Sequence, residues 1–180
     1  MQSTLLTATA FITGKVENAN NKKLAEICID NIKPYSDDVT NSKNEDLQMP
    51  WSDEFKFVID NIQNQYFKNF KQKIILVEYW SQIHKKYQSS NLHNHVDTNN
   101  LGQSPILSGV YYAQIPKNAG KLVFEYNVNQ YQTKRYWVEP EVGKFLLFPA
   151  YLNHFVTENK DDDLRVSIAF NFKYDKIDNE

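Results

Sequence analysis

Hydrophobic residues in the first third of the chain recur at helical spacing in two places. After the polar stretch 18–23, four apolar positions fall on one side of a helix that Pro34 closes. These positions are Leu24, Ile27, Cys28 and Ile32. Before this helix, residues 4–13 are rich in Leu, Thr, Phe and Ile, which predicts a short strand or an extended arm.

The second helical pattern is the stronger one, and it follows a polar, Asn-rich segment at 35–50 that predicts an exposed loop. Ser52 or Asp53 is expected to cap the helix. Glu54 lies in the first turn, where its negative charge interacts favourably with the positive end of the helix dipole. Apolar residues then repeat every three or four positions, which predicts an amphipathic helix. They are Phe55, Val58, Ile59, Ile62, Tyr66, Phe67 and Phe70.

Beyond residue 73 the pattern changes to short runs of aromatic and β-branched residues. Turn-forming sequences separate several of these runs, at 116–120, 140–143 and 159–163. Strands are expected at 74–80, 107–115, 121–126, 135–139, 144–148 and 164–172. Short strands at this spacing predict a sandwich or a barrel, so the chain is expected to be mostly β with N-terminal helices.

The length of 180 residues and the 41% share of hydrophobic residues fit a single domain with one sizeable core, residues 1–180. Within it, residues 1–72 are expected to form an arm and supporting helices, and residues 73–174 the β core. Twenty basic and 22 acidic residues give a net charge of −2, which offers no electrostatic basis for binding nucleic acid or an anionic membrane.

Cysteine usage and hydropathy indicate in which cellular environment the protein is expected. The single cysteine, Cys28, excludes an internal disulfide and a cysteine-based metal cluster. No apolar run approaches the roughly 20 residues that span a bilayer. Residues 1–12 lack the basic start of a secretory signal, so we expect a reduced, cytoplasmic protein without a membrane partner.

Three of the four histidines occur where they can serve a metal site. His95 and Asp97 are two residues apart, and in extended backbone such side chains point to the same side. His154 follows a strong strand pattern and offers a third donor. Two histidines and one carboxylate form the facial triad of non-haem Fe(II) oxygenases, which leaves coordination positions open for a co-substrate and dioxygen. The fourth histidine, His84, is expected to be a partly exposed structural residue.

A second pair of polar residues lies on the last predicted strand. Arg165 and Ser167 share one face of this strand because its side chains alternate. A guanidinium and a hydroxyl that point into a barrel can hold a carboxylate, and arginine supplies a planar fork that lysine lacks. A surface ion pair with Asp162 or Asp163 would not explain an arginine at the start of an apolar strand.

From about residue 79 to 174 the chain resembles the Fe(II)/2-oxoglutarate-dependent dioxygenases, in particular the prolyl-hydroxylase-like branch and the small oxygenases of bacteria and phages. The order and spacing of several short motifs carry the resemblance. They are His95-Val-Asp97, Leu107-Ser-Gly-Val-Tyr-Tyr112, Gly120-Lys-Leu-Val-Phe124, Val138-Glu-Pro-Glu-Val-Gly143, Phe148-Pro149, His154 and Arg165-Val-Ser167.

The resemblance implies a double-stranded β-helix core of the jelly-roll or cupin-like kind, with specific roles for these residues. His95, Asp97 and His154 would hold the iron. The distal carboxylate of 2-oxoglutarate would be bound by Arg165, Ser167 and Tyr112.

Two of these assignments have alternatives. Tyr111 would replace Tyr112 if the strand register shifts by one residue. Some relatives carry an H-x-H pair without the acid, so His93 is open as a ligand, as a residue that supports a ligand, or as a substrate contact.

The implied activity is hydroxylation of a C–H bond with release of succinate and CO2. The implied cofactors are Fe(II), 2-oxoglutarate and O2, with ascorbate as an accessory reductant. A prolyl or other side chain of a peptide or protein is the expected substrate. The alternatives are a nucleic-acid demethylase, a small-metabolite hydroxylase and a non-catalytic cupin-like metal-binding module.

Overall fold

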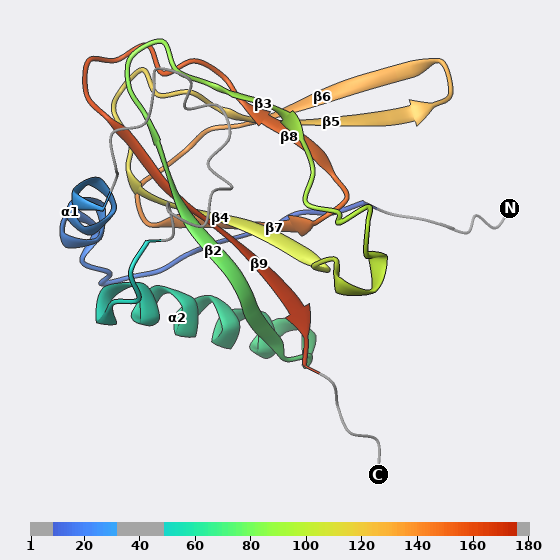
Figure 1. Cartoon of the computed structure of the whole chain (residues 1–180), viewed down its shortest axis with the longest axis horizontal. Helices are drawn as coiled ribbons and strands as arrows, with labels where there is room; N and C mark the ends of the chain where they lie inside the picture. The colour runs from blue at the N-terminus through green and yellow to red at the C-terminus, as the bar shows by residue number, and fades with distance from the viewer. Residues whose placement is uncertain (1–8, 32–48, 176–180) are drawn as a thin grey trace, which may run out of the picture.

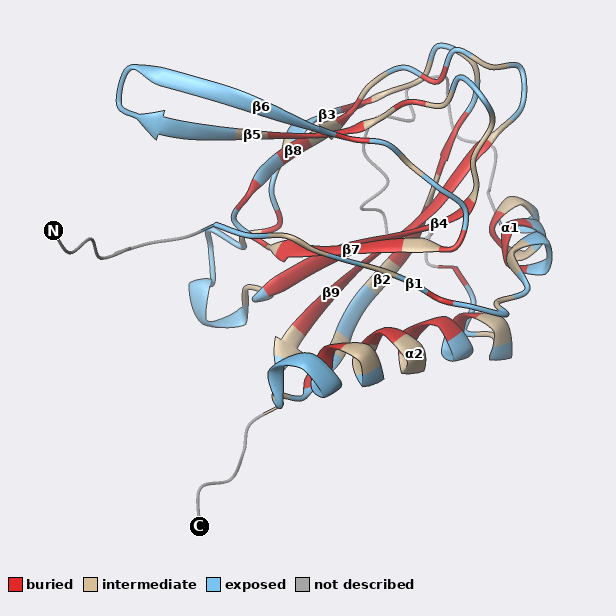
Figure 2. Ribbon diagram, turned by 180° about the vertical axis from the view of Figure 1, so that it is seen from behind, coloured by how far each residue is buried: buried red, intermediate tan, exposed pale blue. Residues whose placement is uncertain are grey.

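The strands of this protein form two antiparallel sheets that face each other. A computed structural model describes residues 9–31 and 49–175 (Figure 1). One sheet has the order β1-β7-β4-β9-β2, and the other has the order β3-β8-β5-β6. Both helices pack on the outer face of the five-stranded sheet, and the β5–β6 hairpin extends beyond the body of the molecule (Figures 1 and 2).

The elements follow the order that the sequence pattern predicts, in which both helices precede every strand but the short β1. The helical elements are α1 (Asn21–Asp30), α2 (Asp53–Phe70) and the short 3-10 helix η2 (Leu101–Gln103). The strands are β1 (Ile12–Lys15), β2 (Ile74–His84), β3 (Ser90–His93), β4 (Leu107–Gln114), β5 (Leu122–Asn129), β6 (Gln132–Val138), β7 (Lys144–Pro149), β8 (Asn153–Val156) and β9 (Arg165–Tyr174). The prediction of a mostly β chain with N-terminal helices is confirmed.

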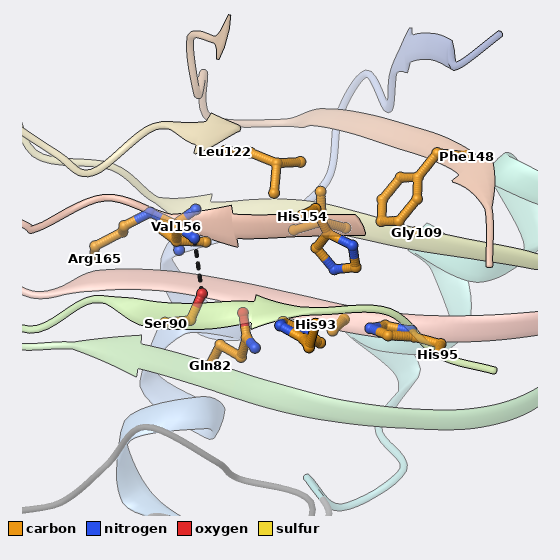
Figure 3. Close-up of a pocket in the computed structure, with 12 residues that line it drawn as sticks. Gln82, Ser90, His93, His95, Gly109, Leu122, Phe148, His154, Val156 and Arg165 are labelled. Carbon is orange, nitrogen blue, oxygen red and sulfur yellow. Dashed lines mark hydrogen bonds between the residues drawn. The ribbon is translucent and has the colours of Figure 1, made fainter. Parts of the chain in front are cut away.

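Strand β9 separates two interiors because its side chains alternate between them. It lies between β4 and β2, and its odd-numbered residues from Arg165 onward face the space between the two sheets. Figure 3 looks into this space. The even-numbered residues of β9, from Val166 to Phe172, pack in the layer between the sheet and the helices.

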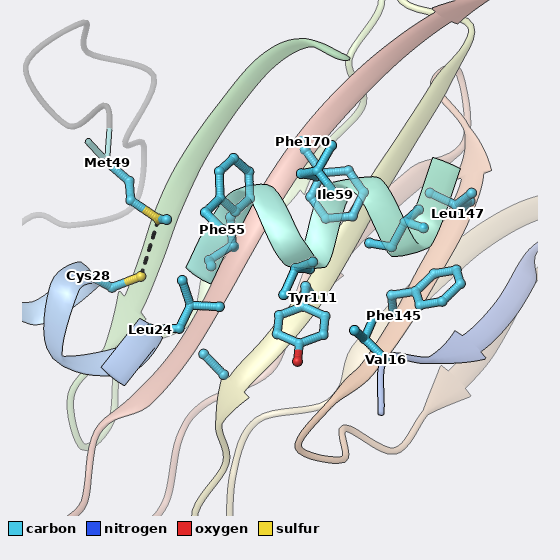
Figure 4. Close-up of a cluster of buried hydrophobic side chains, with 14 of the residues drawn as sticks. Val16, Leu24, Cys28, Met49, Phe55, Ile59, Tyr111, Phe145, Leu147 and Phe170 are labelled. Carbon is cyan, nitrogen blue, oxygen red and sulfur yellow. Dashed lines mark hydrogen bonds between the residues drawn. The ribbon is translucent and has the colours of Figure 1, made fainter. Parts of the chain in front are cut away.

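The layer between the five-stranded sheet and the helices holds the larger hydrophobic core (Figure 4). The Ser52 hydroxyl caps α2 by accepting a hydrogen bond from the backbone N–H of Phe55, as the sequence predicts. The helix buries Phe55, Val58, Ile59, Ile62 and Tyr66 against the sheet.

The last turn of α2 departs from the predicted buried face. Phe67 and Phe70 are 44% and 50% exposed, so the prediction that they belong to this face is wrong. In this last turn the ring of Phe70 contacts that of Tyr66, with the centroids 4.7 Å apart and the planes tilted by 33°. The expected Pro34 stop and the greater part of the loop expected at 35–50 lie outside the described residues.

Two short strands were not predicted from the sequence pattern, and both contribute residues to the site. Strands β3 and β8 have four residues each, which is too short for an alternating pattern to stand out. They pair with each other, and His93 lies opposite His154 in this pairing. Strand β2 runs unbroken from Ile74 to His84, which lies opposite Arg165.

Candidate active site

Three histidines lie together between the two sheets. His93 ends β3, His95 follows two residues later and His154 lies on β8. Their ligand nitrogens all lie within 4.8 Å of one another, and His95 and His154 are buried. Three imidazoles at this separation can share one metal ion, since imidazole suits iron among other transition metals.

Backbone carbonyls orient two of the three rings. Nδ1 of His93 lies 2.7 Å from the carbonyl oxygen of Asn91, and Nδ1 of His154 lies 2.9 Å from that of Leu152. A carbonyl oxygen only accepts hydrogen bonds, so each Nδ1 carries the proton and donates it. In the neutral form of each ring, Nε2 then has the lone pair that a metal ligand requires.

A hydrogen-bonded chain of polar residues orients His95. The Asn171 amide donates from Nδ2 to the Glu78 carboxylate at 2.8 Å, which leaves its Oδ1 to accept from Nδ1 of His95 at 2.7 Å. The Ser108 hydroxyl lies 2.8 Å from both that oxygen and that ring nitrogen. The carboxylate thus fixes the amide, and the amide fixes the imidazole with its Nε2 presented to the cluster.

Removing this support is expected to weaken metal binding. Replacing Asn171 by Ala should lower the affinity for Mn²⁺ or Fe(II) about 10- to 100-fold, because the His95 ring loses its fixed orientation. Titration calorimetry with Mn²⁺ measures this change. Asn153→Ala is the control, since Asn153 is an exposed asparagine on β8 that bonds Asn94 rather than a histidine. Equal metal affinities in the two variants would contradict the supporting role.

The electrostatics of the cluster keep His154 ready for a metal. The pKa of His154 is lowered to about 3, mainly by burial and to a lesser extent by the neighbouring His93 and His95. The ring is therefore neutral at physiological pH, so a metal ion does not have to displace a proton from it.

Asp97 lies outside the histidine cluster. It is exposed, and its carboxylate accepts hydrogen bonds from the backbone N–H groups of Asn99 and Asn100. Its own N–H donates to the Ser104 hydroxyl. The backbone after His93 is no longer a strand, so side chains two residues apart need not share a face there. The structure brings His93, and not Asp97, together with His95 and His154.

Arg165 is the largest fully buried side chain of the described residues, with 0% of its surface exposed. Its Nε donates to the carbonyl oxygen of Gly120 at 3.1 Å, and its Nη1 donates to the Ser167 hydroxyl at 2.9 Å. Burial lowers the pKa of Arg165, but a guanidinium stays protonated in proteins. Across residues 9–31 and 49–175, no carboxylate forms an ion pair with it.

Gly120 can hold this position only because it has no side chain. A Cβ at this residue would lie 1.9 Å from the backbone oxygen of Thr157. The glycine therefore allows the 116–120 turn to approach the end of β8 closely, and this approach places the carbonyl that anchors Arg165.

The two neighbouring tyrosines of β4 point to opposite sides of the sheet. Tyr111 packs in the helix-covered core and its hydroxyl donates to the Asn21 side chain. Tyr112 belongs to the core between the sheets, where the guanidinium carbon of Arg165 lies 5.5 Å from its ring centroid. Burial raises the pKa of Tyr112 to about 12, so its hydroxyl keeps its proton. That hydroxyl is buried and has no hydrogen-bond partner in the part of the chain that the structure describes.

One pocket joins the histidines to Arg165. The space it encloses together with the solvent at its opening is about 380 Å³, and its lining includes His93, His95, His154 and Arg165. Figure 3 shows Arg165 at one end and the histidines at the other, with Ser90 and Gln82 between them. The rest of the wall is mainly apolar. The pocket therefore offers a metal-ligand set and a buried positive charge to one small molecule.

Several residues of the site were not identified from the sequence. His84 is 3% exposed and lies 3.4 Å from Nη1 of Arg165, so the expectation of a partly exposed residue is wrong. Ser108 and Asn171 interrupt apolar strands at buried positions, and this interruption is the signal that could have identified them. Glu78 has no comparable signal, because its only link to the site is the hydrogen bond that its carboxylate accepts from Asn171.

The comparisons with known proteins identify the family. The sequence model of the family described as "Putative 2OG-Fe(II) oxygenase" matches residues 78–171, which is more than half of the 180-residue chain. The chain belongs to this family of 2-oxoglutarate- and iron-dependent oxygenases. Membership supports iron and 2-oxoglutarate as its cofactors, and the three imidazoles and the buried Arg165 fit them. No curated protein gives a significant match.

Solved structures share the fold at low sequence identity. A Pseudomonas putida prolyl-4-hydroxylase is 14% identical, with a TM-score of 0.58 over 92% of this chain and 88% of that one. The epimerase SnoN of nogalamycin biosynthesis, in complex with Fe3+, alpha ketoglutarate and nogalamycin RO, is 11% identical, with a TM-score of 0.62 over 92% and 79%. A 2OG-Fe(II) oxygenase family oxidoreductase from Burkholderia pseudomallei is 10% identical, with a TM-score of 0.54 over 70% of this chain.

The chain spans 59% of the length of the Burkholderia pseudomallei protein. The prediction of a double-stranded β-helix core is confirmed, because these neighbours share the two-sheet fold. Among residues 9–31 and 49–175, neither helix has the length and apolar character required to traverse a bilayer.

Proposed function

We propose that this protein is an Fe(II)- and 2-oxoglutarate-dependent dioxygenase that hydroxylates an unactivated C–H bond. One observation carries the proposal: a single pocket has three convergent imidazoles at one end and a buried arginine without a carboxylate partner among the described residues at the other. When bound, iron and 2-oxoglutarate supply the oxidising chemistry, in which O2 is consumed, succinate and CO2 are released and one oxygen atom goes to the substrate.

His93, His95 and His154 are proposed to hold the iron through their Nε2 atoms. Each Nδ1 is engaged with a fixed acceptor, so the three lone pairs are directed before the metal arrives. Three protein ligands would leave coordination positions of the metal for a chelating co-substrate and O2. Asp97 is the competing third ligand, but it is exposed outside the cluster and its Oδ1 accepts two backbone hydrogen bonds from its own loop.

Arg165, Ser167 and Tyr112 are proposed to hold the distal carboxylate of 2-oxoglutarate. An unpaired guanidinium with no access to water is unfavourable by several kcal/mol, and an anionic ligand removes this penalty. The Tyr112 hydroxyl supplies a neutral donor beside the guanidinium. The apolar wall, which includes Leu122, excludes water from the same end of the pocket.

The proposed substrate is a peptide side chain, with a prolyl residue as first choice. The aromatic surface of the β5–β6 hairpin supports this class. Phe124 lies with its ring centroid 6.2 Å from that of His154 and pairs across the hairpin with Tyr136, which is 50% exposed. Phe11 contacts both aromatic rings. Phe124 is buried beneath Phe11, so these rings lead from the histidines to the half-exposed Tyr136, whose ring can receive a prolyl ring. A neighbour of the same fold is named a prolyl-4-hydroxylase.

Succinate production tests the proposal. Protein freed of metal and then given Fe(II), 2-oxoglutarate and ascorbate under air should release succinate, and omission of either Fe(II) or 2-oxoglutarate should abolish it. A library of proline-containing peptides should raise the rate, with a mass gain of about 16 Da on the product, the mass of one oxygen atom. A protein that binds metal but neither binds nor decarboxylates 2-oxoglutarate would instead be a non-catalytic metal-binding module.

A further inference from the structure

His84 has no assigned role in the site, yet it lies against the proposed carboxylate clamp. It ends β2, directly opposite Arg165 in the pairing of β2 with β9. Its side chain is buried, and its own backbone carbonyl accepts a hydrogen bond from the Asn159 side chain. The main chain is thus held independently of the ring, so the imidazole is available for another contact.

The contacts of Arg165 define what this imidazole does. A guanidinium has five N–H groups, one on Nε and two on each terminal nitrogen. The N–H of Nε donates to Gly120, and the two of Nη1 donate to Ser167 at 2.9 Å and to Nδ1 of His84 at 3.4 Å. Together these acceptors fix the plane of the guanidinium. The N–H groups of Nη2 then remain to donate to a ligand.

The protonation state of His84 is consistent with this contact. Nδ1 can accept only if it carries no proton, so the neutral ring has its proton on Nε2. Burial lowers the pKa of His84 to about 3, and the positive charge of Arg165 contributes to this shift. The imidazole therefore orients the arginine without adding a second positive charge to the pocket.

We propose that His84 is a positioning residue, which holds the Arg165 guanidinium in the rotation that presents Nη2 to the distal carboxylate of 2-oxoglutarate. This inference rests on the proposed function. Its distinct content is that the loss of the His84 acceptor weakens co-substrate binding and leaves metal binding unchanged, because His84 does not belong to the histidine cluster.

Two substitutions at this position separate the acceptor from the ring. His84→Phe keeps a ring of similar size and removes the acceptor. His84→Asn places an amide oxygen on Cγ, where Nδ1 branches in histidine, and so restores an acceptor. The matched control is Ile83→Ala, because Ile83 is buried on the same strand and packs in the helix-covered core. It should destabilise the sheet without touching Arg165.

The experiment is calorimetric titration of 2-oxoglutarate into each Mn²⁺-loaded protein, preceded by titration of the metal alone. The expected result is a Kd for 2-oxoglutarate raised about tenfold in His84→Phe, the scale of one lost hydrogen bond to a charged group. His84→Asn should recover to within about threefold of the parent, Ile83→Ala should match the parent, and all four proteins should bind Mn²⁺ equally.

The outcomes distinguish this inference from the function on which it rests. If the parent protein binds Mn²⁺ but not 2-oxoglutarate, the proposed function fails. If the parent binds 2-oxoglutarate and His84→Phe binds it equally well, only the positioning role fails. Equal weakening in His84→Phe, His84→Asn and Ile83→Ala would show that strand stability, and not the acceptor, controls the affinity, and would overturn the inference.

Discussion

Replacement of His93 by Ala is expected to lower the affinity for Fe(II) or Mn²⁺ at least about 100-fold, whereas Asp97→Ala should leave it within about twofold of the parent. The nitrogen of His93 lies within 4.8 Å of those of the other two histidines, while the Asp97 carboxylate is engaged with the backbone of its own loop. Calorimetric titration, with metal stoichiometry from elemental analysis, measures both effects.

His95→Ala and His154→Ala serve as positive controls for this comparison, because both histidines belong to either version of the ligand set. They should lose the metal as completely as His93→Ala does. The contrary pattern, with metal lost in Asp97→Ala and retained in His93→Ala, would establish the two-histidine and one-carboxylate site and would require the 97–100 turn to rearrange on metal binding.

Replacement of Arg165 by Met is expected to eliminate 2-oxoglutarate binding, with an affinity at least about 100-fold lower, while metal affinity remains that of the parent. The change should alter the free energy of unfolding by no more than about 1–2 kcal/mol, because the lost hydrogen bonds are offset by removal of an unpaired buried charge. Calorimetry measures the binding, and denaturant titration measures the stability.

Arg135→Met is the control for this substitution. Arg135 is an exposed arginine on β6 that pairs with Glu125, so its loss should change neither co-substrate binding nor stability by much. If Arg165→Met instead destabilises the protein by about 3–5 kcal/mol and still binds 2-oxoglutarate as the parent does, the guanidinium serves the fold through its hydrogen bonds to Gly120 and Ser167, and the carboxylate clamp is rejected.

The sequence pattern predicts most of the fold, because the long elements carry a strong period. Helix α2 and its Ser52 cap follow from a repeat over 18 residues, and strands such as β4 and β9 follow from apolar runs of eight to ten residues. The four-residue strands β3 and β8 were missed, although their pairing places His93 opposite His154. Short strands depend on their neighbours in space, which a local pattern does not contain.

The site was predictable where regular backbone continues and not where it ends. The alternation that places Arg165 and Ser167 on one face applies because both belong to β9. The same argument was applied to His95 and Asp97. It does not hold there, because β3 ends at His93 and the alternation of side chains ends with it. Partners such as Asn171 come from a distant strand and are recognisable in retrospect only as polar residues in an apolar run.

The position of β9 along the chain has a consequence for biosynthesis. Among the described strands β9 is the last to be made, yet it inserts between β4 and β2, and one of its faces supplies both Arg165 and Asn171, the asparagine that orients His95. A nascent chain that has reached His154 already contains every candidate ligand but has neither the guanidinium nor the amide support. The proposed site is therefore complete only when β9 has paired with both β4 and β2, and a slip of one residue in this pairing would turn both groups toward the helices at once.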